Sequence, residues 1–394
     1  METLIRPLAR LTFLGTCSLA ASLAFFVAGC GESKQAETKA EGAASPRLKI
    51  AYLGLTCEAA MFVAQEKGFY KDEGIEVEFV KTDWDGLRDG LGLGRFDANY
   101  TLIMYLLKPI EQGLDVKITG GVHSGCLRVQ TGPNSPIQTT ADLKGKKIGI
   151  PTMGSPPFLF ASRALKAQGL DPKKDVEWVV VAPEVMGITL EKGLVDAVAD
   201  SEPLGSILAS KSKVRTLADQ AVDEPYRTEY CCAAVVSGKL AKSNPSAAAK
   251  LTRAMLKGAM WVDKNPTAAA NLAVEKKYVA SSAELNAQAL GKLKYMPSVS
   301  GCRESIGTAA KEMKTAGLLN SSTDPEVLAK SAWIDLEGVS DDWIKGLKVE
   351  EVAGGGRPPK LDDSAFAALF ENDKELHSIL CMGCEGKDSD ICIP

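Results

Sequence analysis

The sequence predicts an α/β protein with two lobes, and three observations support this prediction. First, strand-like and helix-like segments alternate from residue 47 onward, with apolar residues at the spacing typical of each. Second, the same rhythm begins again at residue 142. Third, about 350 residues follow the N-terminal region, which is too many for a single hydrophobic core. Repeated βα units indicate a mostly parallel sheet in each lobe.

Residues 47–128 contain the first series of elements. Its strands are short or alternating apolar runs, and its helices have apolar residues at helical spacing. In chain order we expect the strand RLKIAYLGL, the helix CEAAMFVAQEKGFYKDEG, the strand IEVEFVKT, the helix DGLRDGLGLGRFDANYT leading to a short strand, the helix MYLLKPIEQGL and the strand VKITGGVHSG.

The second series repeats this rhythm between residues 142 and 235. Its segments are KKIGIPT, PFLFASRALKAQGL, VEWVVVAP, MGITLEKGL and VDAVADSEPL. Alanine- and lysine-rich helices follow, and the dipeptides Asn244-Pro245 and Asn265-Pro266 mark turn and cap positions between them. Glycine and proline at residues 352–360 indicate a linker, and the tail beyond it reads as an addition to the main body.

The N-terminus has the pattern of a secretory signal over residues 1–29. Its apolar run is short for a membrane-spanning helix, and polar sequence follows at once. Val27-Ala28-Gly29-Cys30 resembles the lipobox of bacterial lipoproteins, which implies lipid on Cys30; the alternative is an ordinary signal peptide cut elsewhere. Residues 30–46 have almost no apolar content and are expected to form a flexible tether. These features predict an extracytoplasmic or periplasmic body anchored to a membrane.

Charge and histidine content argue against two classes of function. The formal net charge is −4, and no basic patch indicates nucleic-acid binding. The two histidines are His123 and His377, which leaves little material for general-base catalysis. We therefore expect neither a nucleic-acid-binding protein nor an enzyme, and we expect no cofactor.

Several stretches carry a resemblance to a known family. They are AAMFVAQEKGFYKDEGIEVEFV, GLGLGRFDANY, TTADLKGKKIGIPTMGS, GLVDAVADSEPLGSILA, KSNPSAAAKLTRAML and DKNPTAAANLA. Their order over residues 47–345 is similar to that of the solute-binding proteins of ABC importers. The similarity is to the nitrate, sulfonate and taurine branch, which also includes proteins that bind pyrimidine precursors of thiamine.

This resemblance implies a type II periplasmic binding protein with a ligand cleft between its lobes. The first lobe would take residues 47–128 and 235–350, the second residues 129–234, and residues 351–394 would form the cysteine-containing tail. In such sheets the ligand binds outside the carboxyl ends of the strands. Closure of the lobes would then trap it, and an importer permease would recognise the closed form.

In the second lobe, the turn in IGIPTMGSPP is the leading candidate for a ligand contact. Met153, Gly154 and Ser155 follow a strand, and two prolines can occupy the first turn of the next helix. Ser155 would be the N-cap, and unpaired N–H groups there favour an anionic or strongly polar group; the alternative is structural capping alone. The family places Met186 and Glu202 near the cleft, although Glu202 could instead cap a helix or pair with a lysine.

The first lobe offers candidates at three strand ends. They are Thr56 and Cys57 after the first strand, Asn99 and Tyr100 at the third, and His123 and Ser124 at the fourth. Tyr100 could stack on a planar ligand or belong to the core, and we favour a ligand contact for His123. Arg128 is the only arginine near an expected strand end. This weakens the prediction of an anionic ligand and leaves room for a neutral or heterocyclic one.

Ten cysteines are unusual for this family. We expect clustering at the cleft, which would allow disulfides, a soft-metal site or thiols that contact the ligand. Export favours disulfides. The cysteines concerned are Cys57, Cys126, Cys231, Cys232 and Cys302, with a separate tail group of Cys381, Cys384 and Cys392.

The resemblance implies a lipid-anchored binding protein that delivers a small organic or oxyanion solute to an ABC importer. Sulfonates, nitrate, taurine and pyrimidine-like compounds are the candidate solutes. Two alternatives stay open: a metal-dependent enzyme related to the pyrimidine-synthesising proteins of fungi, using the cleft cysteines, and a ligand-sensing pair of lobes.

Overall fold

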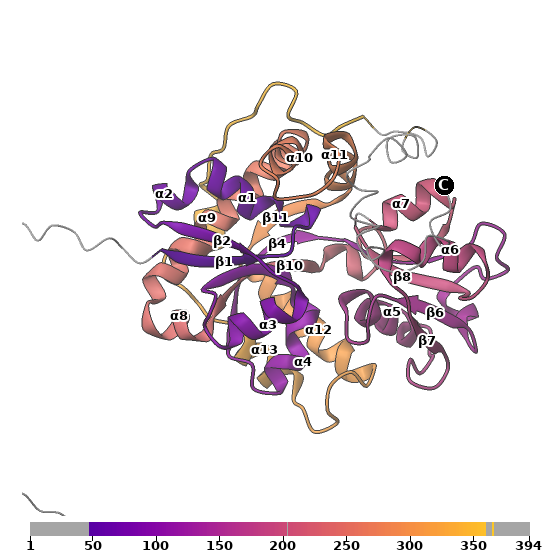
Figure 1. Ribbon diagram of the computed structural model, residues 1–394. Helices are drawn as coiled ribbons and strands as arrows, with labels where there is room; N and C mark the ends of the chain where they lie inside the picture. The colour runs from indigo at the N-terminus through magenta and orange to yellow at the C-terminus, as the bar shows by residue number, and fades with distance from the viewer. Residues whose placement is uncertain (1–46, 203, 360–364, 366–394) are drawn as a thin grey trace, which may run out of the picture. The chain divides into compact units, whose positions relative to one another are not determined.

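Two β-sheets organise the chain, and they confirm the predicted two-lobed α/β fold (Figure 1). The computed structural model describes residues 47–202, 204–359 and 365, all within one unit that begins at Ser45. The first sheet has the order β11 (Lys294–Ser298), β4 (Val116–Ser124), β10 (Tyr230–Ser237), β3 (Ala98–Leu102), β1 (Leu48–Tyr52) and β2 (Val77–Lys81). The second has the order β7 (Glu177–Val180), β6 (Lys147–Ile150), β8 (Ala197–Ser201), β5 (Leu127–Thr131) and β9 (Arg215–Asp219).

Both sheets are mixed: most of their strands run in one direction, as predicted, but β10 and β11 in the first sheet and β5 in the second run the opposite way. Strand β10 runs antiparallel to β3 and β4, and β5 runs antiparallel to β8 and β9. The cause is the chain path: β4 leads out of the first sheet into β5, and β10 brings the chain back from β9. The returning strand enters beside the end of β4, where Tyr230 pairs with Ser124, and so runs in the opposite direction.

Helices cover both faces of the first sheet. Figure 1 shows α10 and α11 on one side of it and α3, α4, α12 and α13 on the other. The helices that accompany this sheet are η1 (Thr56–Glu58), α1 (Ala59–Glu66), α2 (Phe69–Asp72), α3 (Trp84–Gly92), α4 (Ile103–Glu111), α8 (Gly238–Ser243), α9 (Pro245–Lys264), α10 (Pro266–Glu275), α11 (Ala283–Lys292), α12 (Ser300–Thr315), α13 (Pro325–Ala332) and α14 (Asp341–Lys345).

The second sheet is accompanied by shorter helices. They are η2 (Thr140–Leu143), α5 (Pro156–Ala167), η3 (Pro183–Val185), α6 (Met186–Glu191), α7 (Leu204–Lys211) and η4 (Tyr226–Thr228). Helix α5 is buried along most of its length and also contacts α4 and α12 of the first lobe. Within residues 47–202, 204–359 and 365, no helix is both long enough and apolar enough to cross a bilayer.

Local signals explain where several helices begin and end. The side chain of Asn244 accepts a hydrogen bond from the Ala247 N–H and caps α9, as the Asn-Pro dipeptide predicts. The single helix expected over residues 57–74 is instead divided into η1, α1 and α2. Gly68 has a φ of 75°, a left-handed conformation that ends α1 and that glycine adopts without a steric penalty.

Candidate ligand pocket between the two sheets

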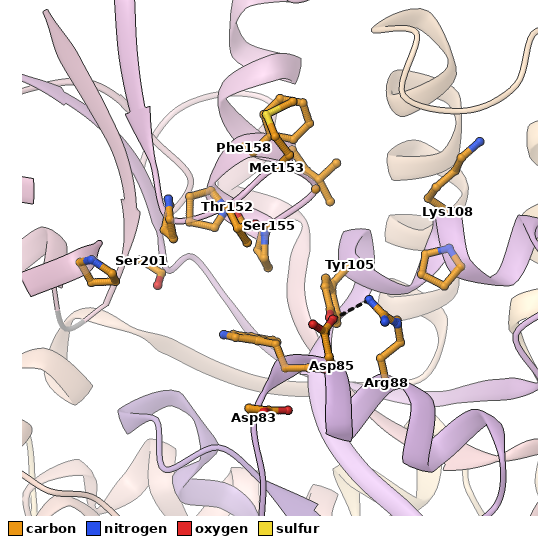
Figure 2. A pocket seen from close by; sticks show the side chains of 18 of the residues that line it. Asp83, Asp85, Arg88, Tyr105, Lys108, Thr152, Met153, Ser155, Phe158 and Ser201 are labelled. Carbon is orange, nitrogen blue, oxygen red and sulfur yellow. Dashed lines mark hydrogen bonds and ion pairs between the residues drawn. The ribbon is translucent and has the colours of Figure 1, made fainter. Parts of the chain in front are cut away.

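A cavity of about 740 Å³ lies between elements of the first and second lobes (Figure 2). The first lobe contributes the start of α3, one face of α4 and two leucines, Leu55 and Leu318. The second lobe contributes the β6–α5 turn from Pro151 to Leu159, together with Pro183 and the residues that follow β8. The pocket therefore has charged walls on one side and a turn rich in proline and apolar side chains on the other.

The β6–α5 turn places three predicted residues in this pocket. Gly154 has a φ of 80°, which turns the chain sharply after β6. Met153 is 56% exposed, and Ser155 is the N-cap of α5, with Pro156 as the first helical residue. The Ser155 hydroxyl is buried, makes no capping bond and has no hydrogen-bond partner in the part of the chain that the structure describes. This hydroxyl is available to a ligand.

The prolines also limit what the end of α5 can offer. Free backbone N–H groups in the first turn of a helix are the usual anion donors. Pro156 and Pro157 have no N–H, and the Leu159 N–H is bonded to the Ser155 carbonyl at 3.0 Å. The expectation of a backbone anion cradle is therefore only weakly supported here, because most of its donors are absent.

Two cations line the opposite wall. Arg88 on α3 contacts Asp85 at 2.9 Å and Asp89 at 2.8 Å, and the hydrogen bond to Asp89 raises the pKa of the guanidinium. Lys108 on α4 contacts Glu111 and lies 3.0 Å from the Asn320 side-chain oxygen. Both side chains are about one-third exposed, so water or a ligand can reach them.

Aromatic side chains stand beside these cations. Trp84 and Tyr105 meet edge to face with their ring centroids 5.1 Å apart, and the Tyr105 hydroxyl donates to the Trp84 carbonyl at 3.2 Å. Across the cavity, Phe158 packs edge to face on Trp178 at 4.8 Å. These contacts hold flat apolar surfaces on both sides of the pocket.

An ion-pair network fixes Glu202, which lines the pocket. Its carboxylate lies 2.5 Å from the Arg128 guanidinium and accepts a hydrogen bond from the Ser206 hydroxyl at 2.7 Å. Arg128 also pairs with Asp219 at 2.9 Å. Burial alone would lower the pKa of Arg128, but the neighbouring carboxylates raise it, whereas burial raises the pKa of nearby Asp200. Glu202 therefore lines the cavity as a paired, structural carboxylate.

The structure divides the predicted site residues into two groups. Met153, Gly154, Ser155 and Glu202 line the pocket. The others are buried outside its lining: Thr56, Cys57, Asn99, Tyr100, His123, Ser124 and Met186. Thr56 donates to the Asn286 side chain at 2.7 Å, Asn99 donates to the Ala51 carbonyl at 2.7 Å, and Met186 packs in a small core of the second lobe.

The pocket residues that the sequence reading missed are mainly on helices. Arg88, Lys108, Trp84 and Tyr105 lie on α3 and α4, whereas most of the residues predicted from the sequence lie at strand ends. A usable signal was present: Asp83 caps α3 directly after β2, so the first turn of α3 stands at a carboxyl end of the first sheet.

Metal-ligating side chains gather elsewhere in the first lobe. Cys57, His123 and Cys232 form one buried group, and Cys126, Cys231 and Cys232 form a second. Burial lowers the pKa of His123 to about 4, so its ring is neutral near pH 7. Among the described residues the five cysteines are free thiols, and Cys302 belongs to neither group. The lipobox, Cys30, His377 and the tail cysteines lie outside the described residues.

Comparisons with known proteins agree with this architecture. The chain matches the NMT1-like family over residues 41–275, more than half of its length. The nitrate/nitrite binding protein NrtA of Nostoc sp. is 24% identical over 95% of this chain and 93% of its own. The periplasmic nitrate-binding protein NrtA from Synechocystis superposes with a TM-score of 0.60 at 18% identity, over 83% of this chain and 98% of that one.

A further structural neighbour binds a larger compound. The alkanesulfonate-binding protein SsuA from Xanthomonas axonopodis, bound to MOPS, superposes with a TM-score of 0.59 at 18% identity, over 74% of this chain and 99% of that one. At this identity the likeness establishes the fold. The family match goes further and covers both the β1–β4 region and the second sheet. The chain is thus a member of the NMT1-like family, with the fold of a periplasmic binding protein.

Proposed function

We propose that this protein is an extracytoplasmic solute-binding component of an ABC importer and that its ligand is a small organic anion. The observation that carries the proposal is the cavity of about 740 Å³ to which both lobes contribute side chains. A ligand that touches both lobes stabilises the closed arrangement by its preference for that state, which is how a binding protein signals occupancy.

The lining of the pocket supports an organic solute with one charged end. Arg88 and Lys108 provide positive charge on one wall, and Thr152 and the unpaired Ser155 hydroxyl provide polar contacts on the other. Phe158 and neighbouring apolar side chains lie on the same wall as Ser155. A sulfonate or taurine-like head next to a short apolar body matches this arrangement better than nitrate does, because nitrate has no apolar surface to bury.

Delivery and anchoring complete the proposal. Two relatives at the level of sequence and fold are nitrate-binding proteins, and a structural neighbour is an alkanesulfonate-binding protein, which supports an importer permease as the partner. We propose lipid on Cys30 and a tether over residues 30–46, with lobes of residues 47–128 and 235–350 and of residues 129–234. The linker and tail would follow from residue 351.

A binding role is favoured over catalysis by the placement of the histidine. His123 is buried outside the pocket lining and is neutral, so no described histidine faces the proposed solute. The alternative of a metal-dependent enzyme places its cysteines in the cleft, yet none of the described cysteines lines the cavity. A sensor role would use the same pocket and differs only in its partner.

Ligand-induced thermal stabilisation of the purified protein tests this proposal. A solute at 100 times its Kd adds about 2.7 kcal/mol to the free energy of unfolding. We expect alkanesulfonates or taurine to raise the Tm more than nitrate or pyrimidines do. Arg88→Gln and Lys108→Gln should each weaken binding by about tenfold, since each removes a charge-assisted contact of about 1.5 kcal/mol.

Two further variants define the site. Ser155→Ala should weaken binding by about threefold to tenfold while leaving the Tm of the free protein nearly unchanged, because its hydroxyl makes no internal bond. Arg303→Gln is the matched control, since Arg303 pairs with Asp335 on the surface away from the pocket. Full retention of the ligand-induced shift by both the Arg88 and the Lys108 variants would contradict the assignment of the pocket.

A further inference from the structure

We propose that Cys57, His123 and Cys232 form a binding site for a thiophilic metal ion of the Zn²⁺ type, buried in the first lobe where the chain leaves and re-enters the first sheet. Cys126 and Cys231 lie next to this site and offer thiolates for a fourth coordination position. The proposal does not depend on the identity of the solute, because none of these residues lines the ligand pocket.

The fold brings these side chains together from distant parts of the sequence. Cys57 lies on η1 after β1, His123 lies near the end of β4, and Cys126 follows on the segment leading to β5. Cys231 and Cys232 lie at the start of β10, where Cys232 is paired with His123. The site therefore joins η1 to both segments that connect the two sheets.

A bulge in β10 explains how two adjacent cysteines reach one cluster. Successive residues of a regular strand point to opposite faces of the sheet. Tyr230 pairs with Ser124 and Cys232 with His123, so two steps along β10 correspond to one step along β4, and Cys231 is the extra residue. Regular alternation would have separated the Cys231 and Cys232 side chains.

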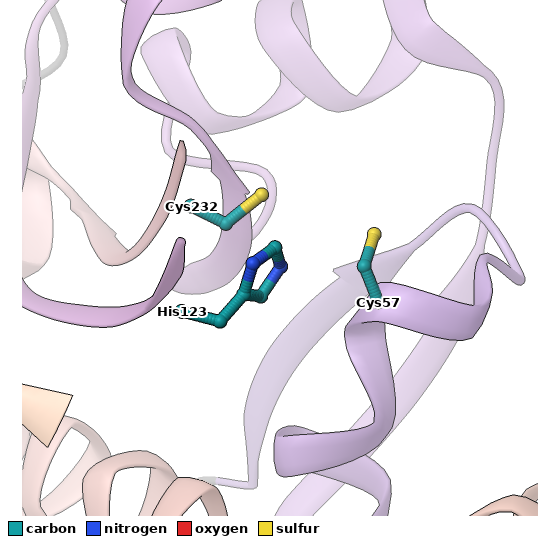
Figure 3. Close-up of side chains that lie close together, drawn as sticks. All are labelled: Cys57, His123 and Cys232. Atoms are coloured by element: carbon teal, nitrogen blue, oxygen red, sulfur yellow. The ribbon is translucent and has the colours of Figure 1, made fainter. Parts of the chain in front are cut away.

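The distances suit coordination by one ion. The ligand atoms of Cys57, His123 and Cys232 all lie within 4.8 Å of one another, as do those of Cys126, Cys231 and Cys232. Figure 3 shows the Cys57, His123 and Cys232 side chains gathered from separate segments of the chain. In a tetrahedral zinc site, with bonds of about 2.0–2.3 Å, ligand atoms are separated by roughly 3.3–3.8 Å. Small side-chain rotations would bring the group to that spacing.

His123 carries an independent sign of a missing partner. Its Nε2 atom is fully buried and has no hydrogen-bond partner within the described residues, whereas Nδ1 faces the Ser124 carbonyl at 3.4 Å. An unsatisfied buried nitrogen costs about 1–3 kcal/mol. With the proton on Nδ1 directed at that carbonyl, the Nε2 lone pair is free to bind a metal, which is the usual arrangement of zinc-ligating histidines.

The surroundings are suited to a soft ion. Tyr100 and Tyr295 pack against the His123 ring at centroid distances of 5.6 and 5.2 Å, and both are buried. The Tyr295 hydroxyl donates to the Cys57 carbonyl at 2.7 Å and fixes the η1 backbone beside the site. Two thiolates and one neutral imidazole balance the charge of Zn²⁺, so the set of Cys57, His123 and Cys232 with its ion would bury no net charge.

A disulfide alone does not account for this cluster. The Cys126 and Cys231 thiols are 2.9 Å apart and are the pair best placed to be joined. Joining them would leave Cys57, Cys232 and the bare Nε2 of His123 as they are. The proposed three-ligand set stands whether or not Cys126 and Cys231 are linked.

Metal titration of the full-length protein tests the proposal. Protein reduced and freed of metal by a chelator should bind one equivalent of Zn²⁺, detected by elemental analysis after gel filtration. One equivalent of Co²⁺ should give sulfur-to-cobalt charge-transfer absorption and the visible bands of a tetrahedral site. Zn²⁺ should also raise the Tm by mass action.

Variants identify the ligands and control for misfolding. Cys57→Ser, Cys232→Ser and His123→Gln should each lower Zn²⁺ affinity at least tenfold and abolish or shift the cobalt spectrum. Cys302→Ser is the matched control: it removes another fully buried thiol, on α12, that belongs to neither group. His123→Gln keeps all thiols, so its cobalt spectrum remains informative if a cysteine variant fails to fold.

Three results would overturn the proposal. One is reduced wild-type protein that binds no stoichiometric metal. Another is a Cys302→Ser variant that loses as much affinity as Cys232→Ser. The third is unchanged Zn²⁺ affinity in folded His123→Gln. None of these results bears on solute binding, which is read separately from the Arg88 and Lys108 variants.

Discussion

The ligand pocket and the cysteine–histidine site handle polar groups in opposite ways. In the pocket, Arg88 and Lys108 are partly exposed and already paired with carboxylates of their own helices. In the buried site, the His123 Nε2 atom has no partner among the described residues and is shielded from water. Exposed charges that are already paired can exchange water for a solute and back at a low cost in free energy. A buried ligand atom without a partner instead favours an ion that stays bound.

The largest expected effect concerns two arginines that differ in burial. Arg128 is 10% exposed at its side chain and pairs with Glu202 and Asp219, whereas the Arg88 side chain is 30% exposed. Arg128→Met should destabilise the protein by about 3–5 kcal/mol, because it leaves buried carboxylates without a counter-charge. Arg88→Met should cost less than about 1 kcal/mol. Urea unfolding followed by circular dichroism measures both.

This pair of variants also separates stability from binding. Arg88→Met should weaken solute binding while leaving the free energy of unfolding nearly unchanged. Arg128→Met should lower the free energy of unfolding, while the fraction that folds still binds the solute. Equal losses of stability in the two variants would mean that the difference in burial does not control their energetics.

The second effect compares two glycines with similar backbone conformations. Gly125 has a φ of 70° beside Cys126, and Gly154 has a φ of 80° in the pocket. A Cβ at Gly125 would lie 2.5 Å from the Ala221 Cβ, whereas a Cβ at Gly154 would meet nothing within 4 Å. Gly154→Ala should cost about 1–2 kcal/mol through backbone strain. Gly125→Ala should cost about 2–4 kcal/mol, because overpacking adds to that strain.

Thermal unfolding of both alanine variants, compared with wild type, measures this difference. Gly154→Ala also reports on the pocket, since its new methyl group faces open space next to Ser155. A larger loss of stability in Gly154→Ala than in Gly125→Ala would contradict the close packing of Gly125 against Ala221.

Local signals made most of the fold predictable. The βα rhythm located β1 to β4, β6, β7 and β8, but not β5, β9, β10 or β11. The Ser-Pro-Pro and Asn-Pro sequences located the starts of α5 and α9 correctly. These signals depend on residues within one turn of each other. The direction of β10 was not predictable in this way, because it depends on the path of the chain through the second lobe.

The site was less predictable for a related reason. Arg88 and Lys108 reach the pocket only because α3 and α4 pack with those side chains toward the cavity, which depends on tertiary contacts. The two adjacent cysteines of β10 reach the same cluster through a bulge, which the alternation of side chains along a regular strand does not predict. Ser155, in contrast, was found because a cap residue after a strand has a local signature.

The smallest expected effect comes from a carboxylate that belongs to neither site. Asp341 accepts hydrogen bonds from the Val299 N–H at 2.7 Å and the Ser300 N–H at 3.0 Å, at the start of α12. Partial burial alone would raise its pKa, but bonds from Ser300, Val299 and Ser298 together lower it to about 2, against an ordinary value of 3.8.

The sign of the resulting pH dependence follows from that lowered pKa. Ionised Asp341 contributes its stability above about pH 4, and the contribution is lost as the pH falls from about 4 to about 2. Because the carboxylate is only partly buried, we expect about 1 kcal/mol, reduced by screening. Asp341→Asn should therefore be less stable than wild type at pH 6 and nearly equal to it at pH 2, as measured by urea unfolding at both values. A gap between the two proteins that does not narrow toward pH 2 would show that Asp341 acts through shape and not through charge, unlike the arginines compared above.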